Sequence, residues 1–279
     1  MATAAVHSAA IEAWCDEEPR NPDALMMNAR VQTQRALLAF RKGVSAEHQF
    51  RIADLARKCC WYAMRCAHPQ DPVPYVCLLA LAHVDSDWKY PNRRRPEHFA
   101  EPEEPMLPRG PWPLLWEVLR RDPGNREGYQ RMLQYFHARG DGGMEFAQWA
   151  ASRAPEGSAQ LTLPLYALAE SYQLGLTQGT VITRLGFWAK EPVWFHAERA
   201  RDGWFAHVSP STCSLVDLNH LAYALIASGA GGAWPVFEAI GPYATSAPWK
   251  QLHTVSYQAN QSWKDDFHRA RAMAKEGRR

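Results

Sequence analysis

Four short segments with the periodicity of an α-helix follow one another between Pro111 and Tyr172, and they constrain the fold more than any other feature. The second segment has large apolar residues at i, i+3, i+4 and i+7, which is one face of a helix: Tyr129, Met132, Leu133 and Phe136. Residues typical of turns separate the segments: 122–125, 140–143 and 155–158. Helices of about three turns with such short links must lie antiparallel and stack.

Helical periodicity continues on both sides of this stretch, and no run of strand length alternates apolar with polar residues. Further helices are predicted over residues 3–14, 23–41, 45–67, 74–83, 177–188, 191–206, 214–228, 234–240 and 261–275. The sequence therefore predicts an all-α fold. Because an array of stacked helix pairs is stabilised pair by pair, it can grow to 279 residues as one domain. We expect residues 1–279 to form a single superhelical array of antiparallel helix pairs.

Three proline-containing turns indicate an internal repeat. Pro19–Leu25 aligns with Pro69–Tyr75 at an offset of 50 residues, and Pro69–Tyr75 aligns with Pro123–Tyr129 at an offset of 54. In each copy proline ends one helix, polar residues reverse the chain, and a large apolar residue follows six positions after the proline. In the third copy, Asn125 is placed to cap the next helix. One helix pair cannot bury its apolar face alone, so the repeated pairs are expected to stack.

Residues 86–113 interrupt this pattern with seven prolines in 28 residues, so no regular helix is expected there. Long loops of this kind are often functional. This loop carries two tryptophans near its ends and three consecutive arginines: Trp88, Trp112, Arg93, Arg94 and Arg95. We interpret the arginines as contacts for an anionic partner group and the tryptophans as apolar anchors. The alternative is an inserted loop whose arginines pair with its own glutamates.

The charges are nearly balanced, because 31 Lys and Arg face 29 Asp and Glu. Outside the three arginines of the loop, no basic stripe of the kind used for nucleic-acid binding occurs, so we expect no nucleic-acid partner. The longest apolar run, Val73–Val84, is too short to span a bilayer. The first residues lack the basic and apolar regions of a signal peptide. We therefore expect a protein with no membrane partner.

The six cysteines are expected to be free thiols in a reducing cytoplasm. Four of them fall between residues 59 and 77, inside apolar helical patterns, whereas secreted disulfide scaffolds place cysteines in loops. Cys59 and Cys60 are adjacent, so on a helix they point about 100° apart, which suits structural zinc poorly. We predict neither a metal nor a cofactor.

Twelve tryptophans are present, and their sequence contexts differ. Seven of them lie on predicted helices at positions that can be packing, and most of these seven are expected in the core: Trp61, Trp116, Trp149, Trp188, Trp194, Trp204 and Trp234. Trp88, Trp112 and Trp249 flank prolines in predicted loops. One of these three is the better candidate for an exposed anchor.

No catalytic motif stands out, so the catalytic residues, if there are any, stay unknown. The compact acidic pairs are Asp85 with Asp87 and Asp265 with Asp266, and paired carboxylates hold Mg²⁺ in all-α enzymes that ionise isoprenoid diphosphates. Neither pair extends to a full D-D-x-x-D pattern. The second pair also lies near the start of a predicted helix, where acidic side chains favour the helix dipole. Ser/His/Asp or Cys/His catalysis stays open, because such residues meet in space rather than in sequence.

Three stretches resemble a known family: residues 116–133, residues 141–147 with Pro155, and residues 217–223 with 239–241 and 248–249. Together they resemble an uncharacterised bacterial family of tetratricopeptide-like proteins that is grouped as a domain of unknown function. The family's Trp-Gly-Gly-Ser-like step is Arg139-Gly-Asp-Gly-Gly143 in this chain. The resemblance implies a helical array with a concave groove for a peptide or partner protein. It carries over no catalytic residue.

Two hypotheses about function follow. The first is a cytoplasmic interaction module without catalysis, which holds a peptide or partner protein in a concave groove. Its polar inner face would include Asn125, Arg126, Asn219 and His220, with the 86–113 loop over one edge. The second is an all-α enzyme of specialised metabolism that encloses an apolar small molecule behind aromatic walls. An open groove favours the first, and a closed cavity of several hundred Å³ with convergent polar groups favours the second.

Overall fold

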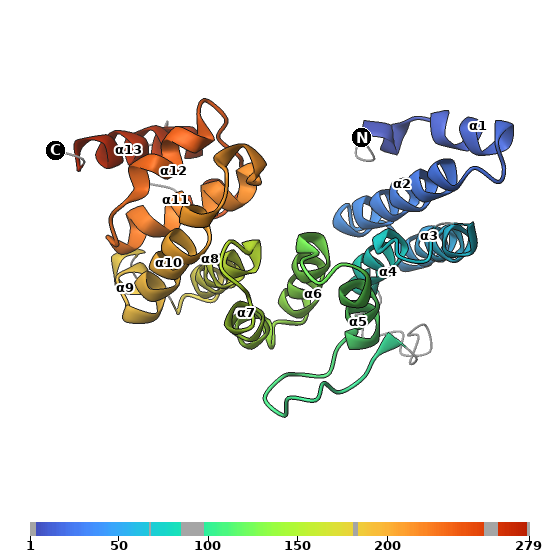
Figure 1. Ribbon diagram of the computed structural model, residues 1–279, viewed down its shortest axis with the longest axis horizontal. Helices are drawn as coiled ribbons and strands as arrows, with labels where there is room; N and C mark the ends of the chain where they lie inside the picture. Colours follow the sequence, from blue (N-terminus) through green and yellow to red (C-terminus); the bar gives the residue numbers. More distant parts are fainter. Residues whose placement is uncertain (1–3, 67, 85–97, 181–183, 254–261, 278–279) are drawn as a thin grey trace. The chain divides into compact units, whose positions relative to one another are not determined.

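The computed structural model describes residues 4–66, 68–84, 98–180, 184–253 and 262–277, and within them every regular element is a helix (Figure 1). The prediction of an all-α protein is confirmed. The chain divides into two compact units, Met1–Gly143 and Met144–Arg279. The α-helices that begin in unit 1 are α1 (Ala10–Glu17), α2 (Pro22–Arg41), α3 (Ala46–Cys66), α4 (Val73–Ala82), α5 (Trp112–Arg121), α6 (Arg126–Arg139) and α7 (Gly143–Ser152).

Unit 2 contains most of α7 and the remaining α-helices: α8 (Leu163–Thr177), α9 (Arg184–Trp188), α10 (Glu191–Gly203), α11 (Leu215–Ser228), α12 (Ala233–Ile240) and α13 (Trp263–Glu276). Short 3₁₀ helices cover Ala4–His7, Ala159–Thr162, Phe205–His207 and Pro210–Thr212. The helix predicted over 177–188 is wrong at its start, since α8 ends at Thr177 and residues 178–180 are not helical. None of the described helices is both long enough and apolar enough to cross a bilayer.

In unit 1, α2 packs against α3 and α4, and α4 packs in turn against α5 and α6 (Figure 1). Where α2 meets α3, the hydroxyl oxygen of Thr33 lies 3.9 Å from the sulfur of Cys60. The other side chains buried on these two helices are mostly small: Ala24, Ala29, Ala36, Ala39, Ala53, Ala56 and Ala63. Side chains of this size let two helices approach closely, so added volume would force them apart.

Each of the three proline-containing turns directly precedes one of α2, α4 and α6. Asn21, Asp71 and Asn125 each accept a hydrogen bond from a backbone N–H in the first turn of the helix that follows, at 2.7–3.1 Å. These bonds satisfy amides that have no partner inside the helix. The predicted cap by Asn125 is therefore confirmed, and local side-chain chemistry explains why these three helices start where they do.

The described part of the 86–113 segment, from residue 98, folds back on itself before α5, where Figure 1 draws a long green loop. The backbones of Ala100 and Gly110 pair in both directions, with N–O distances of 3.0 and 3.2 Å. The expectation that the whole segment avoids helix is wrong at its end, because α5 already begins at Trp112. Pro113 is tolerated there because backbone N–H groups in the first turn of a helix have no acceptor within the helix, so the N–H that proline lacks is not required.

The core of unit 2 contains a run of aromatic rings that links helices far apart in the sequence. Trp188 of α9 contacts Tyr223 of α11 at 5.0 Å between ring centroids, Tyr223 contacts Trp249 at 5.1 Å, and Trp249 contacts Phe267 of α13 at 5.3 Å. All three contacts are edge-to-face, the geometry that aromatic pairs favour. These side chains are fully buried, so they hold α9, α11 and α13 in one core.

Candidate functional site

A hollow of about 260 Å³ crosses the three helices of unit 1 that follow the proline-containing turns. The second half of α2, the residue that follows α4 and the middle of α6 line it: Gln34, Leu37, Phe40, Arg41, His83, Arg131 and Gln134. The helices are held around it by the contacts of α4 with both α2 and α6. The hollow is therefore formed by residues that are distant in the sequence.

The apolar part of this hollow is formed by Leu37 and Phe40. Both belong to the apolar stripe of α2, whose helical spacing predicts burial in the core and which also includes Ala29, Thr33 and Ala36, yet both are only half-buried. The Phe40 ring meets the imidazole of His83 edge-to-face at 5.1 Å. Nδ1 of His83 lies 3.2 Å from the backbone carbonyl oxygen of Gln134, so it carries the hydrogen of that bond. His83 thus fixes the end of α4 to α6.

The electrostatic environment of the hollow is positive. Burial and the nearby guanidinium groups of Arg131 and Arg41 lower the pKa of His83, so its ring is neutral at neutral pH. Glu127 accepts hydrogen bonds from Arg30 of α2 and from Arg131, both at 3.1 Å. Burial raises the pKa of Glu127, but the two arginines outweigh burial and leave that pKa below its usual range. One carboxylate thus faces two cations.

Arg41 adds a further positive charge at the rim. It is exposed, and its Nε donates to the carbonyl oxygen of Leu37 at 3.4 Å, while no described carboxylate pairs with it. The amide of Gln34 forms no hydrogen bond to another described residue. Oε1 of Gln134 accepts from Arg131 at 3.1 Å, which leaves the amide N–H₂ of Gln134 for another acceptor. The lining residues include no carboxylate and no thiol, so the charged groups that the hollow presents are cationic hydrogen-bond donors.

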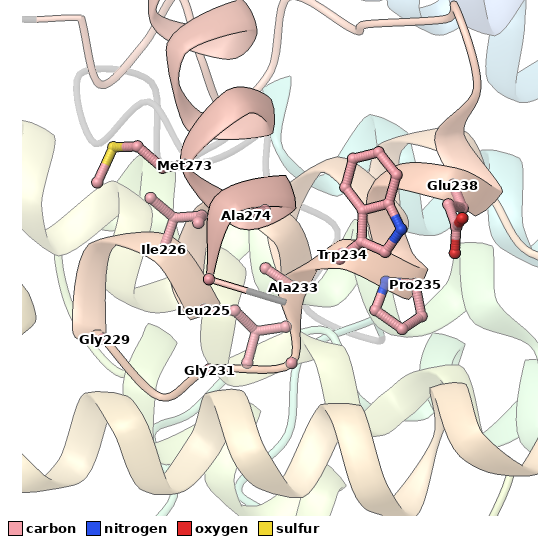
Figure 2. Close-up of a pocket in the computed structure, with 12 residues that line it drawn as sticks. Leu225, Ile226, Gly229, Gly231, Ala233, Trp234, Pro235, Glu238, Met273 and Ala274 are labelled. Carbon is pink, nitrogen blue, oxygen red and sulfur yellow. The ribbon is translucent and has the colours of Figure 1, made fainter. Parts of the chain in front are cut away.

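A second cavity, of about 400 Å³, lies in unit 2 between α11, α12 and α13 (Figure 2). Figure 2 shows Ile226 and Met273 on one side of it and Trp234 and Pro235 on the other. Its size falls within the range of small-molecule sites. However, Glu238 is the single ionisable side chain among the residues that line it. The cavity therefore lacks the convergent polar groups that would favour the enzyme hypothesis.

Two of the residues predicted to line a groove, Asn125 and Arg126, lie together at the start of α6. Oδ1 of Asn125 accepts from the backbone N–H of Gly128 at 2.7 Å, and its Nδ2 donates to Asp122 at 2.9 Å. Both ends of this amide are thus engaged within the turn. Arg126 is the first residue of α6 and is half-buried.

The other two predicted groove residues, Asn219 and His220, lie on α11 in unit 2. Both are buried, so neither side chain lies on the protein surface. Asn219 bonds the indole of Trp249, and the imidazole of His220 stacks on the ring of Tyr166 with centroids 3.7 Å apart. The physical reason is that α11 is buried on several sides, by α8, α10, α12 and α13. Polar side chains on such a helix serve its own packing.

The tryptophan assignments are also corrected. Trp112 is buried, its Nε1 donates to the carbonyl oxygen of Pro108 at 2.9 Å, and its ring packs against Phe136, so it is no exposed anchor. Trp249 is buried as well. Two of the seven tryptophans on predicted helices are exposed, with relative accessibilities of 43% and 38%: Trp116 and Trp194. Trp88, Arg93, Arg94 and Arg95 lie outside the described residues.

The acidic pairs and the cysteines have local roles where they are described. Asp265 forms a reciprocal cap with Ser262 at the start of α13, and Asp266 lies 2.6 Å from Nδ1 of His253. Asp85 and Asp87 lie outside the described residues. All six cysteines are free. In the described ranges, no three His, Cys, Asp or Glu side chains come together as metal ligands.

Comparisons with protein-family models, with curated proteins and with solved structures find no match for this chain. Sequence reasoning missed the hollow of unit 1 because Leu37 and Phe40 fit the core pattern of α2. One signal was present: Arg41 follows Leu37 by four residues, which places a cation beside an apolar residue on the same helical face. Function is therefore inferred from the hollow itself.

Proposed function

We propose that this chain is a cytoplasmic interaction module without catalysis, and that the hollow of unit 1 holds a peptide segment of a partner protein. One observation carries the proposal. Three helices that start at equivalent proline-containing turns contribute to one hollow. The side chains of Gln34, Gln134 and Arg41 form no hydrogen bonds with one another. A surface with open donors beside apolar side chains is suited to a ligand that has both kinds of group.

The size of the hollow favours a peptide over a free small molecule. Pockets for small molecules have volumes of about 300–1,000 Å³, whereas this one has about 260 Å³. A space of this size admits side chains of a longer ligand whose backbone continues along the surface. The open donors would then bond the ligand's carbonyl or carboxylate oxygens.

We further propose that α2 to α6 form a tetratricopeptide-like superhelix, as the resemblance implies. Support comes from the packing, because α2, α4 and α6 contact one another in sequence order and each helix from α2 to α5 also contacts the next helix in the chain. The cytoplasm is proposed as the compartment because six free thiols suit a reducing environment.

The test is selection of a random peptide library against the purified chain, followed by binding to two matched variants. Gln34→Trp fills the hollow, whereas Gln173→Trp places the same side chain on an exposed position of α8 in unit 2. We expect selected peptides to lose at least tenfold in affinity for Gln34→Trp and none for Gln173→Trp, with unchanged melting of both. Peptides that bind both variants like the parent chain would refute the proposal.

A further inference from the structure

We infer that the peptide held in this hollow is acidic, with a carboxylate beside Arg41 and Arg131 and an apolar side chain on Leu37 and Phe40. This inference rests on the proposed function, since it names the chemistry of the ligand for the same hollow. It follows from three properties of the described residues: their charge, their open hydrogen-bond donors and the spacing of polar and apolar groups.

The charge around the hollow is the first argument. Glu127 is shared by Arg30 and Arg131, so this trio keeps one net positive charge. Arg41 contributes a second, and no described carboxylate pairs with it. A cationic ligand would be repelled by both charges, and a neutral ligand would be attracted to them less strongly than an anionic one. An anionic group is therefore the one that this hollow favours.

The donors are the second argument. Arg41 and the N–H₂ group of Gln134 present hydrogen atoms, and Gln34 can turn its amide to present its own N–H₂ group. Hydrogen bonds to an ionised acceptor are roughly twice as strong as those between neutral groups. A carboxylate has two oxygens that accept such bonds, so it can engage an arginine and an amide together.

The spacing is the third argument. Leu37 and Arg41 are one helical turn apart, so their Cβ atoms are about 5–6 Å from each other. In an extended peptide, side chains on the same face are two residues apart, which is about 7 Å. A peptide with its acidic and apolar residues separated by one position therefore matches the hollow. The pattern is acidic-x-apolar or its reverse.

The experiment uses blocked hexapeptides with one fixed central pattern: Glu-x-Leu, Gln-x-Leu, Lys-x-Leu, Glu-x-Ser, or the reversed order of each. Binding to the full chain is measured by fluorescence anisotropy at low and at physiological salt. Arg41→Gln removes the exposed charge, and Arg51→Gln on α3 is the matched control. Gln34→Trp reports whether a bound peptide occupies the hollow.

We expect Glu-x-Leu, in one of its two orders, to bind at least tenfold more tightly than the matching Gln-x-Leu, Lys-x-Leu and Glu-x-Ser peptides. Arg41→Gln should reduce the preference for Glu over Gln at least fivefold, whereas Arg51→Gln should preserve it. If the Glu and Gln peptides bind equally well and Gln34→Trp blocks both, the inference of an acidic ligand is refuted. The proposal that the hollow binds a peptide is then still supported. If no peptide is blocked by Gln34→Trp, the proposed function itself fails. Displacement of the acidic peptide by inorganic phosphate at equal concentration would overturn the inference in favour of a phosphate site.

Discussion

The indole nitrogen of Trp249 donates a hydrogen bond to Oδ1 of Asn219 over 2.8 Å, and both side chains are almost fully buried. The Nδ2 of Asn219 donates to the carbonyl oxygen of Leu215 at 2.7 Å. Asn219 therefore links α11 to the loop that follows α12. A side chain that the sequence suggested for ligand binding instead holds the fold of unit 2 together.

Replacement of Asn219 by alanine should lower the free energy of unfolding by about 2–3 kcal/mol, because it leaves the buried N–H of Trp249 without an acceptor. Trp249→Phe removes that N–H but keeps an aromatic ring. Urea unfolding of both single variants and the double variant gives the coupling energy, which should be about 0.5–3 kcal/mol. Strictly additive effects would show that the hydrogen bond contributes nothing.

Two neighbouring tryptophans should respond very differently to alanine. Trp112 is buried against Phe136, so Trp112→Ala should destabilise unit 1 by about 3–5 kcal/mol. Trp116 is 43% exposed, and Trp116→Ala should cost about 1 kcal/mol or less. Thermal melting followed by circular dichroism separates the two results. A larger loss for Trp116 would contradict the burial described here.

Acid should destabilise unit 1 through His137. Burial lowers the pKa of His137 to about 4, whereas the unfolded chain has the ordinary value near 6.5. As pH falls below 6.5, the unfolded chain takes up a proton that the folded chain does not, so stability is lost toward pH 4. At about 1.4 kcal/mol per pH unit, this single group accounts for up to about 3 kcal/mol.

His137→Asn should flatten the pH dependence of stability between pH 7 and pH 4, as measured by urea unfolding at several pH values. The same substitution at the exposed His48 serves as the control. If His137→Asn leaves the slope unchanged, then the imidazole of His137 is protonated in the folded chain as readily as in the unfolded one.

The thiols should react slowly with a disulfide reagent such as Ellman's. Burial raises the pKa of Cys59 to about 11, so at pH 8 only about one molecule in a thousand carries the thiolate. Cys60 and Cys77 are buried, and they should react only when the chain unfolds. Labelling with and without urea, mapped by mass spectrometry, tests this, with Cys59→Ser to assign the slow phase. Fast labelling of Cys60 in the folded chain would be the contrary result.

Helix positions were predictable from sequence wherever local chemistry fixes them. The start of α2 is indicated by Asn21 followed by Pro22, and the start of α6 is indicated by Asn125. The side chains of the two asparagines accept hydrogen bonds from backbone N–H groups in the first turn of the helix that follows each. These features depend on residues within one or two turns, so the sequence displays them directly.

The candidate site was not predictable in the same way. Leu37 and Phe40 continue the apolar stripe of α2, and only the placement of α4 and α6 leaves them open to a hollow. Trp112 stands beside a proline, and its burial depends on Phe136, which is 24 positions further along the chain. The burial of these side chains depends on tertiary contacts. Helical periodicity and turn residues in the sequence do not predict such contacts.

The paired backbones of Ala100 and Gly110 separate the tip of the loop before α5 from the helices that follow it. Met106 at that tip is 86% exposed, while Leu107, Gly110 and Trp112 are buried. A change in the length of the tip should therefore not shift the position of α5. Each doubling of such a loop costs only about 0.6 kcal/mol, so the tip is a place where the chain can carry an inserted epitope or fluorophore without disturbing the helices of unit 1.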